Sequence, residues 1–97
     1  MPDDLARIIV STLVEYDFRH VSKEQMHQLI DFGRAWGMTD FEKHKVYLRN
    51  DLPRSDEYVT ALHEIGHIYL KNTGADRYNE DEADRLAYEW MKRFYVG

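Results

Sequence analysis

The sequence contains no cysteine and only two prolines among its 97 residues. Without cysteine there is neither a disulfide nor a thiolate metal site, so any metal must be held by His, Asp or Glu. Lys and Arg total 13 against 18 Asp and Glu, a net charge of −5. This balance disfavours nucleic acid and anionic membranes as partners, because both are bound through clustered positive charge.

The sequence also lacks a long hydrophobic run and a leader-like start. No apolar stretch approaches the roughly 20 residues that span a bilayer. The first residues, Met-Pro-Asp-Asp, lack the basic start and apolar core of a signal peptide. We therefore expect a cytoplasmic protein with no membrane partner. A chain of this length, with 43% hydrophobic residues, is expected to form one domain over residues 1–97.

The hydrophobic pattern predicts a mostly helical α+β domain with a small sheet. Helices are expected over residues 3–16, 22–37, 55–72 and 79–95, and a strand over 45–49. In the first segment a strand stays possible, because residues 7–14 are rich in β-branched side chains. Charged residues on both sides of the strand at 45–49 suggest that it lies at a sheet edge, with Val46 and Leu48 on one face.

Several residues are expected to mark helix ends and buried faces. Ser22 and Gln25 have the spacing of a capping box, and Gly37 should end that helix. The third helix should be capped by Ser55 or Asp56 and closed by Gly74. The buried stripes expected on the second and fourth helices are Met26, Leu29, Ile30, Gly33 and Trp36, and Ala83, Ala87, Trp90, Met91 and Phe94.

The third predicted helix contains the sequence His63-Glu64-Ile65-Gly66-His67. Residues four apart share a helix face, so both imidazoles can bind one Zn²⁺ without bending the backbone. Glu64 lies about 100° around the helix from His63, so it can border the metal without binding it. A carboxylate there can take a proton from a zinc-activated water and pass it to a leaving amine. The pattern is typical of zinc metallopeptidases.

The alternative interpretation of this motif is a buried helix whose histidines only form hydrogen bonds. Three titratable groups on a central, largely apolar helix would be costly without a partner, and a metal ion supplies one. Gly66 in mid-helix costs about 1 kcal/mol relative to alanine, which suggests that another element packs closely there. The apolar residues of the helix are Val59, Ala61, Leu62, Ile65, Ile68 and Leu70.

A catalytic zinc usually has three protein ligands and one open position, so a third ligand is required. The acidic start of the fourth predicted helix offers the candidates Glu80, Asp81, Glu82 and Asp84. These residues would equally suit an ordinary helix N-terminus, where carboxylates are favoured. Only their occurrence together with the histidine pair makes them candidate ligands.

Two stretches of the sequence resemble a known group of enzymes. The motif His63–His67 and the string Glu80-Asp81-Glu82-Ala83-Asp84 are similar to the active-site and ligand helices of gluzincin metallopeptidases, in particular the ImmA/IrrE family. The resemblance covers about residues 46–91 and implies a zincin-like arrangement of these two helices. The shortness of the chain resembles the minimal gluzincins, which are latent proenzymes.

By this resemblance Glu80 is the third zinc ligand and Glu64 the general base. Asp84, where the ImmA/IrrE family usually has Asn, would accept a hydrogen bond from the ring of His63, as carboxylates near zinc-binding histidines often do. Helical spacing agrees, because Glu80 and Asp84 are four residues apart, whereas Glu82 lies about 200° around the helix from Glu80.

The sequence thus predicts a zinc-dependent metallopeptidase acting on a peptide or protein substrate, with a regulatory role implied by the resemblance. A strand such as 45–49 could align an extended substrate. The alternative is a zinc-stabilised binding or regulatory module without activity, which the small size favours and the intact Glu64 disfavours. A DNA-binding helix pair within residues 3–36 is a third possibility, although acidic residues outnumber basic ones there.

Among the remaining polar residues, His20, His27 and His44 lie between polar neighbours and are expected to be solvated surface histidines. Tyr78 and Arg85 are candidates for stabilising the oxyanion of a tetrahedral intermediate, which gluzincins require.

Overall fold

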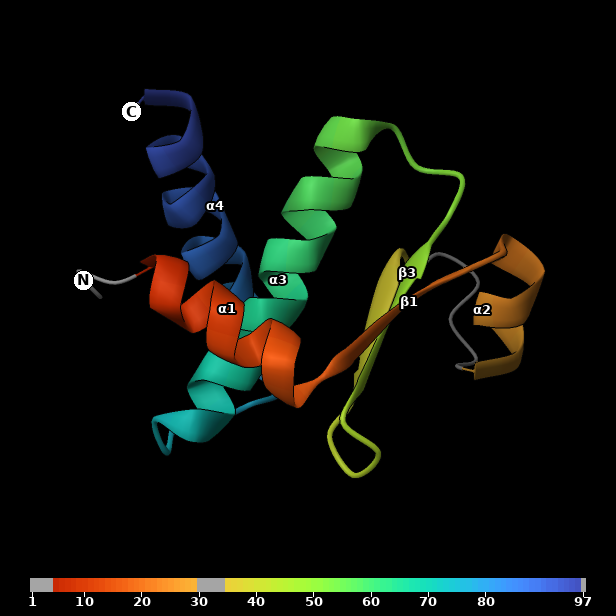
Figure 1. Cartoon of the computed structure of the whole chain (residues 1–97), viewed down its shortest axis with the longest axis horizontal. Coiled ribbons are helices and arrows are strands. Elements are labelled where there is room, and N and C mark those ends of the chain that lie inside the picture. Colours follow the sequence, from red (N-terminus) through yellow and green to blue (C-terminus); the bar gives the residue numbers. More distant parts are fainter. Residues whose placement is uncertain (1–4, 30–34, 97) are drawn as a thin grey trace.

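The computed structural model describes residues 5–29 and 35–96, which form an α+β arrangement with four helices and a three-stranded sheet (Figure 1). The elements are α1 (Leu5–Glu15), β1 (Asp17–Val21), α2 (Lys23–Leu29), β2 (Gly37–Asp40), β3 (Lys45–Arg49), α3 (Arg54–Asn72) and α4 (Glu80–Val96). The mostly helical α+β class predicted from the sequence is confirmed. None of the helices in the described ranges combines the length and hydrophobicity that a membrane span requires.

Helix α3 is the centre of the fold, with the sheet on one side and helices α1 and α4 on the other (Figure 1). Towards the sheet, Ile68 packs with Val46, Leu48 and Tyr16. Towards the helices, a larger cluster contains Leu62, Ile65, Leu70, Ala83, Leu86, Ala87 and Trp90. Burial on both sides explains why this helix is apolar around most of its circumference.

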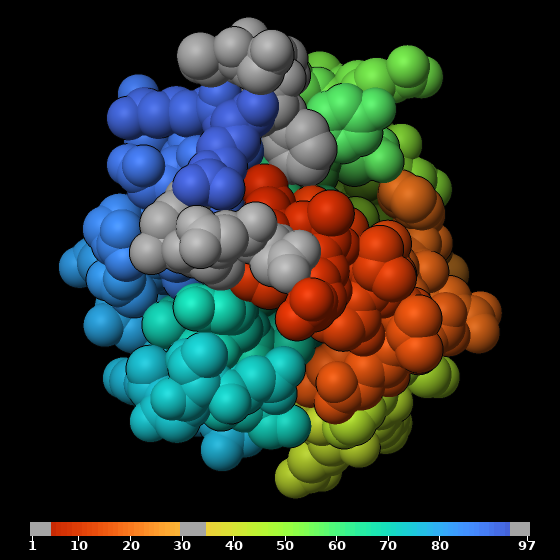
Figure 2. Space-filling model, turned by 60° about the vertical axis from the view of Figure 1, so that its left-hand side comes forward, coloured from red at the N-terminus to blue at the C-terminus, as the bar shows by residue number. Residues whose placement is uncertain are grey.

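Helix α1 covers the outer side of this larger cluster. On the face seen in Figure 2 it lies at the centre, and its neighbours include α3 and β1. Residues Leu5–Glu15 form a helix, so the predicted helix is confirmed and the alternative strand is not. Leu5, Ile8 and Ile9 pack against the cluster, whereas Leu13 is 52% exposed.

The sheet has the order β1-β3-β2, so β3 is its central strand. It pairs in parallel with β1 and antiparallel with β2. The predicted edge position of residues 45–49 is wrong. Lys45 and Arg49 occupy the ends of the strand, where Arg49 reaches Asp51 in the following turn, while Val46 and Leu48 are buried as predicted. In the described part of the chain, β2 is an outer strand.

The helix predicted over residues 22–37 is confirmed at its start and wrong at residues 35–37, and residues 30–34 lie outside the described part. The backbone N–H of Ser22 donates to the Gln25 side chain at 2.9 Å, and the Gln25 N–H donates to the Ser22 hydroxyl at 3.1 Å, so the capping box is confirmed. The described part of α2 ends at Leu29, and Gly37 begins β2. Met26 is buried, Leu29 and Trp36 are 38% and 45% exposed, and Ile30 and Gly33 lie outside the described residues.

Gly37 therefore has a different role from the predicted helix stop. A Cβ at this position would lie 2.7 Å from Cγ2 of Thr60 on α3. Only glycine allows the strand to approach the helix this closely. β1 and β2 were not predicted, because their burial does not alternate and each has at most five residues.

Helix α3 begins at Arg54, so the predicted caps Ser55 and Asp56 are wrong. Pro53 occupies the N-cap without a side-chain hydrogen bond, and the fixed φ of proline suits a helix start. The predicted closure of α3 by Gly74 is confirmed. Gly74 has a φ of 81°, and the next residue, Ala75, donates to the Leu70 carbonyl at 2.8 Å, which closes the last turn.

The close packing expected at Gly66 is confirmed. A Cβ on Gly66 would lie 3.3 Å from the carbonyl oxygen of Ala83, so α3 and α4 nearly touch at their backbones. Asn79 caps α4 by accepting a hydrogen bond from the Glu82 N–H at 3.0 Å. Along α4, Ala83, Ala87 and Trp90 are buried and Met91 packs on the same cluster, while the side chain of Phe94 lies outside the described part.

Candidate metal centre

The close crossing of α3 and α4 brings two histidines and one glutamate together. His63 Nε2 and His67 Nε2 lie 3.0 Å apart on adjacent turns of α3. From the first turn of α4, one oxygen of Glu80 lies 3.2 Å from His63 Nε2 and the other lies 2.8 Å from His67 Nε2. These three side chains form a group that can hold a metal ion.

The donor set and its spacing fit a metal ion. Two ligands of one tetrahedral zinc, each bonded at about 2.0–2.1 Å, are roughly 3.3 Å apart, which is close to the separations seen here. Both histidines are largely shielded from solvent, whereas the Glu80 side chain is 71% exposed. The group is therefore open on the side of α4, where a further ligand or a substrate can approach.

Each imidazole is held through the nitrogen that faces away from this group. His63 Nδ1 lies 2.6 Å from a carboxylate oxygen of Asp84, and His67 Nδ1 lies 2.6 Å from the carbonyl oxygen of Arg77. Both partners are acceptors, so Nδ1 must be the protonated nitrogen, and the Nε2 lone pair is left to bind a metal. The structure thus places Asp84 where the sequence predicted a partner for His63.

The other acidic candidates lie away from the group. Glu82 is bonded to Arg85 one turn further along α4, with the Arg85 Nε donating at 2.9 Å. This hydrogen bond lowers the pKa of the Glu82 carboxyl below its ordinary value. Asp81 is exposed on the same turn and belongs to no metal-holding group among the described residues. The pairing also occupies Arg85, one of the two oxyanion candidates.

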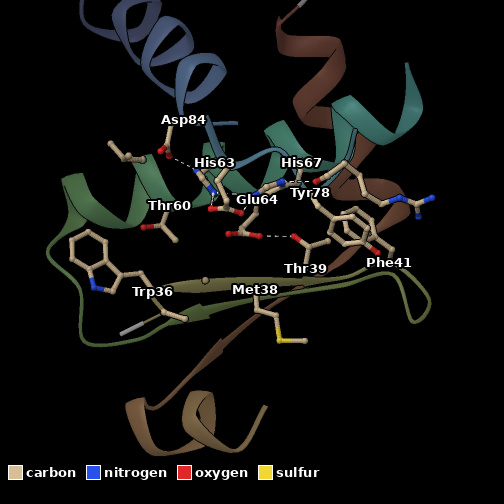
Figure 3. A pocket seen from close by; sticks show the side chains of 15 residues that line it. Trp36, Met38, Thr39, Phe41, Thr60, His63, Glu64, His67, Tyr78 and Asp84 are labelled. Atoms are coloured by element: carbon tan, nitrogen blue, oxygen red, sulfur yellow. Dashed lines mark hydrogen bonds and ion pairs between the residues drawn. The ribbon is translucent and has the colours of Figure 1, made fainter. Parts of the chain in front are cut away.

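The metal-holding group faces a cavity of about 460 Å³ between α3, β2 and the start of α4. In Figure 3, Trp36 lies at one end of this cavity and the Phe41 and Tyr78 rings lie at the other. Tyr78, the second oxyanion candidate, is 71% exposed, and its ring packs edge-on against Phe41 at 6.0 Å between centroids. The cavity therefore has a polar centre and aromatic ends.

Glu64 borders the metal-holding group, turned towards β2 as Figure 3 shows. Its side chain is buried, with only 6% of the residue exposed, and the Thr39 hydroxyl donates to its Oε1 at 2.7 Å. Burial raises the pKa of the Glu64 carboxyl, and the hydrogen bond from Thr39 partly offsets this effect. A buried carboxyl with a raised pKa beside a cavity is typical of a group that exchanges protons.

We expect Glu64→Gln to raise the melting temperature of the metal-free protein at neutral pH and above. Because folding raises the pKa of Glu64, the wild type loses stability as the pH rises from the ordinary pKa of the carboxyl through the raised one. The neutral amide removes this cost. The difference from wild type should shrink as the pH falls through the raised pKa and disappear in acid. Thermal unfolding with a chelator present at stepped pH measures it, and a pH-independent difference would contradict the prediction.

The surface position predicted for the other histidines is confirmed for two of them. His20 and His27 are exposed, and His20 Nε2 lies 3.2 Å from a carboxylate oxygen of Glu57. His44 is half-buried, because its ring stacks on Tyr16 with 4.6 Å between centroids.

Three contributions to the site were missed by sequence reasoning. Thr39 and Gly37 belong to β2, a strand that the sequence did not predict, because the helix expected over residues 22–37 ends there. The carbonyl of Arg77 has no signal in the sequence, because every residue has one. Comparison of the chain with protein-family models, with curated proteins and with solved structures found no match in any of the three.

Proposed function

We propose that this protein is a zinc-dependent metallopeptidase of the gluzincin type, with His63, His67 and Glu80 as the zinc ligands. One observation carries the proposal: a metal-holding group and the buried carboxylate of Glu64 face the same cavity. Two imidazoles and one carboxylate favour zinc over Mg²⁺ and Ca²⁺, which prefer all-oxygen sites. Helices α3 and α4 would be the active-site and ligand helices of a zincin-like fold.

A zinc ion held at this group would supply a Lewis acid for the scissile carbonyl and lower the pKa of water. Glu64 accepts the proton of the attacking water and delivers it to the leaving amine nitrogen. Its burial supports this role, because a raised pKa brings a carboxylate closer to the pH at which a general base works. Asp84 and the Arg77 carbonyl keep the imidazoles in their ligating orientation.

The position of β2 supports an extended peptide or protein segment as the substrate. This outer strand borders the cavity, and a strand edge can pair with an extended chain through main-chain hydrogen bonds. Residues 45–49, predicted for this role, are central in the sheet and already paired on both sides. Trp36 and Tyr78 at opposite ends of the cavity can contact side chains on either side of the cleaved bond. A regulatory, cytoplasmic protease is the narrower form of this proposal.

A zinc-stabilised module without activity accounts for the three ligands but not for Glu64. A structural site is satisfied by its ligands and has no need of a further carboxylate. Glu64 is kept buried and ionisable beside the group, at a cost that its hydrogen bond to Thr39 offsets only in part. The enzyme is therefore the better explanation of the geometry.

The proposal predicts that the purified protein binds one zinc ion per chain and is stabilised by it. Binding to the folded state alone should raise the free energy of unfolding by about 2.7 kcal/mol at a free zinc concentration 100 times Kd. Native mass spectrometry before and after chelation gives the stoichiometry, and thermal unfolding gives the stabilisation. The matched control is His27→Ala, an exposed histidine, which should behave like wild type, whereas His67→Ala should lose both effects. No bound zinc and an unchanged melting temperature would contradict the proposal.

A further inference from the structure

The side chain of Glu64 is fixed by β2 and not by its own helix. Gly37 and Thr39 are two residues apart on that strand, so both face α3. The Thr39 hydroxyl donates to Glu64 Oε1 at 2.7 Å, as the dashed line in Figure 3 shows. The two residues thus meet the carboxylate from the side opposite to α3.

Gly37 provides the space for the second carboxylate oxygen. A Cβ at this position would lie 3.2 Å from Glu64 Oε2 and 3.3 Å from Glu64 Cγ, tighter than ordinary van der Waals contact. The carboxylate therefore fits against bare backbone at Gly37. One oxygen is bound by a hydroxyl, and no hydrogen bond to the other is seen among the described residues.

Thr39 is itself held firmly. It lies opposite Val46 in the antiparallel pair of β2 and β3, and Val46 is completely buried in the central strand. The hydroxyl is thus presented from a paired strand and not from a mobile loop. A glutamate has three side-chain torsions, and fixing them from a rigid element removes freedom that would otherwise be lost during the reaction.

We propose that Thr39 is a positioning residue for the general base: it binds Oε1 of Glu64 and so leaves Oε2 to accept the proton of the attacking water. This inference rests on the proposed peptidase function. A hydroxyl is suited to the task, because it donates one hydrogen bond, which orients one carboxylate oxygen and leaves the other without a partner. Thr39 is not a zinc ligand, so its effect should appear in kcat and not in metal binding.

The test compares Thr39→Val, which keeps the shape but removes the hydroxyl, with Thr39→Ser, which keeps the hydroxyl. With zinc bound, Thr39→Val should lower kcat for a peptide substrate by roughly 10–100-fold at little change in KM. Thr39→Ser should restore most of the rate. In a Glu64→Gln background, Thr39→Val should cause no further loss, because its effect passes through Glu64. Equal kcat in wild type and Thr39→Val would overturn the inference. It would also be overturned if Thr39→Val lowered kcat by the same factor in the Glu64→Gln background as in the wild type.

A structural measurement keeps this inference separate from the proposed function. In crystal structures of the zinc-loaded proteins, the Glu64 carboxylate should stay beside Gly37 in wild type and Thr39→Ser, and leave that place in Thr39→Val. If the wild type cleaves no peptide, the peptidase proposal fails, while these structures still decide whether Thr39 positions Glu64. The same carboxylate position in all three structures would overturn the role of Thr39.

Discussion

Glu64→Gln is expected to slow peptide cleavage severely while leaving the zinc content of the protein unchanged. The amide has nearly the same shape as the carboxylate but cannot accept the proton of the attacking water. General base catalysis contributes typically 10²–10⁴-fold, so kcat should fall by about this factor. Because Glu64 lies outside the group formed by His63, His67 and Glu80, zinc binding should persist. Cleavage of a fluorogenic peptide library, with zinc measured on the same samples, tests both statements.

A matched control is available on the same helix. Glu57 also lies on α3, but its carboxylate pairs with His20 away from the cavity, so Glu57→Gln should cleave like wild type. Equal activity of wild type and Glu64→Gln would show that Glu64 is not the base. Loss of zinc from Glu64→Gln would instead show that the carboxylate helps to hold the metal, and the assignment of ligands would have to change.

Zinc affinity should separate the acidic residues of α4 by their roles. Glu80→Ala should cause the largest loss, because it removes one of the three side chains that can hold the metal. Asp84→Ala should weaken binding by roughly 10–100-fold, because it removes the acceptor that orients His63 at 2.6 Å. Glu82→Ala should bind zinc like wild type, because Glu82 pairs with Arg85 instead.

Competition with a chromophoric chelator measures the three affinities under one set of conditions. The three substitutions lie within five residues of one another in α4, so a general weakening of the helix would affect all of them alike. A loss of zinc in Glu82→Ala without a loss in Glu80→Ala would overturn the assignment. Equal losses of zinc affinity in all three would indicate that binding depends on the stability of α4 and not on the individual carboxylates.

The metal-holding residues were predictable because the spacing that defines them is local. Residues four apart on a helix must share a face, whatever the rest of the fold does. This rule places His63 beside His67 and Glu80 beside Asp84, and only the contact between two neighbouring helices remained to be found. Gly66 indicated that some element packs closely against this helix, and the structure shows that the element is α4.

The sheet was less predictable, because its strands are short and their partners are distant in sequence. β2 has four residues of intermediate burial, so no alternation separates it from a loop or a helix end. From the sequence alone, Gly37 indicates the end of a helix. Only the structure shows that a side chain at this position would clash with Thr60. The central place of β3 depends on β1 and β2 pairing with it, and its own residues carry no sign of either partner.

Parallel pairing of β1 with β3 bears on the order in which the chain folds. It joins residues 17–21 to 45–49, whereas α3 and α4 are consecutive and their contacts are local. Distant pairings form more slowly, because a large loop must close before any contact is gained. The antiparallel pair of β2 and β3 and the pair of α3 and α4 each join consecutive elements, so we expect both to form before β1 completes the sheet.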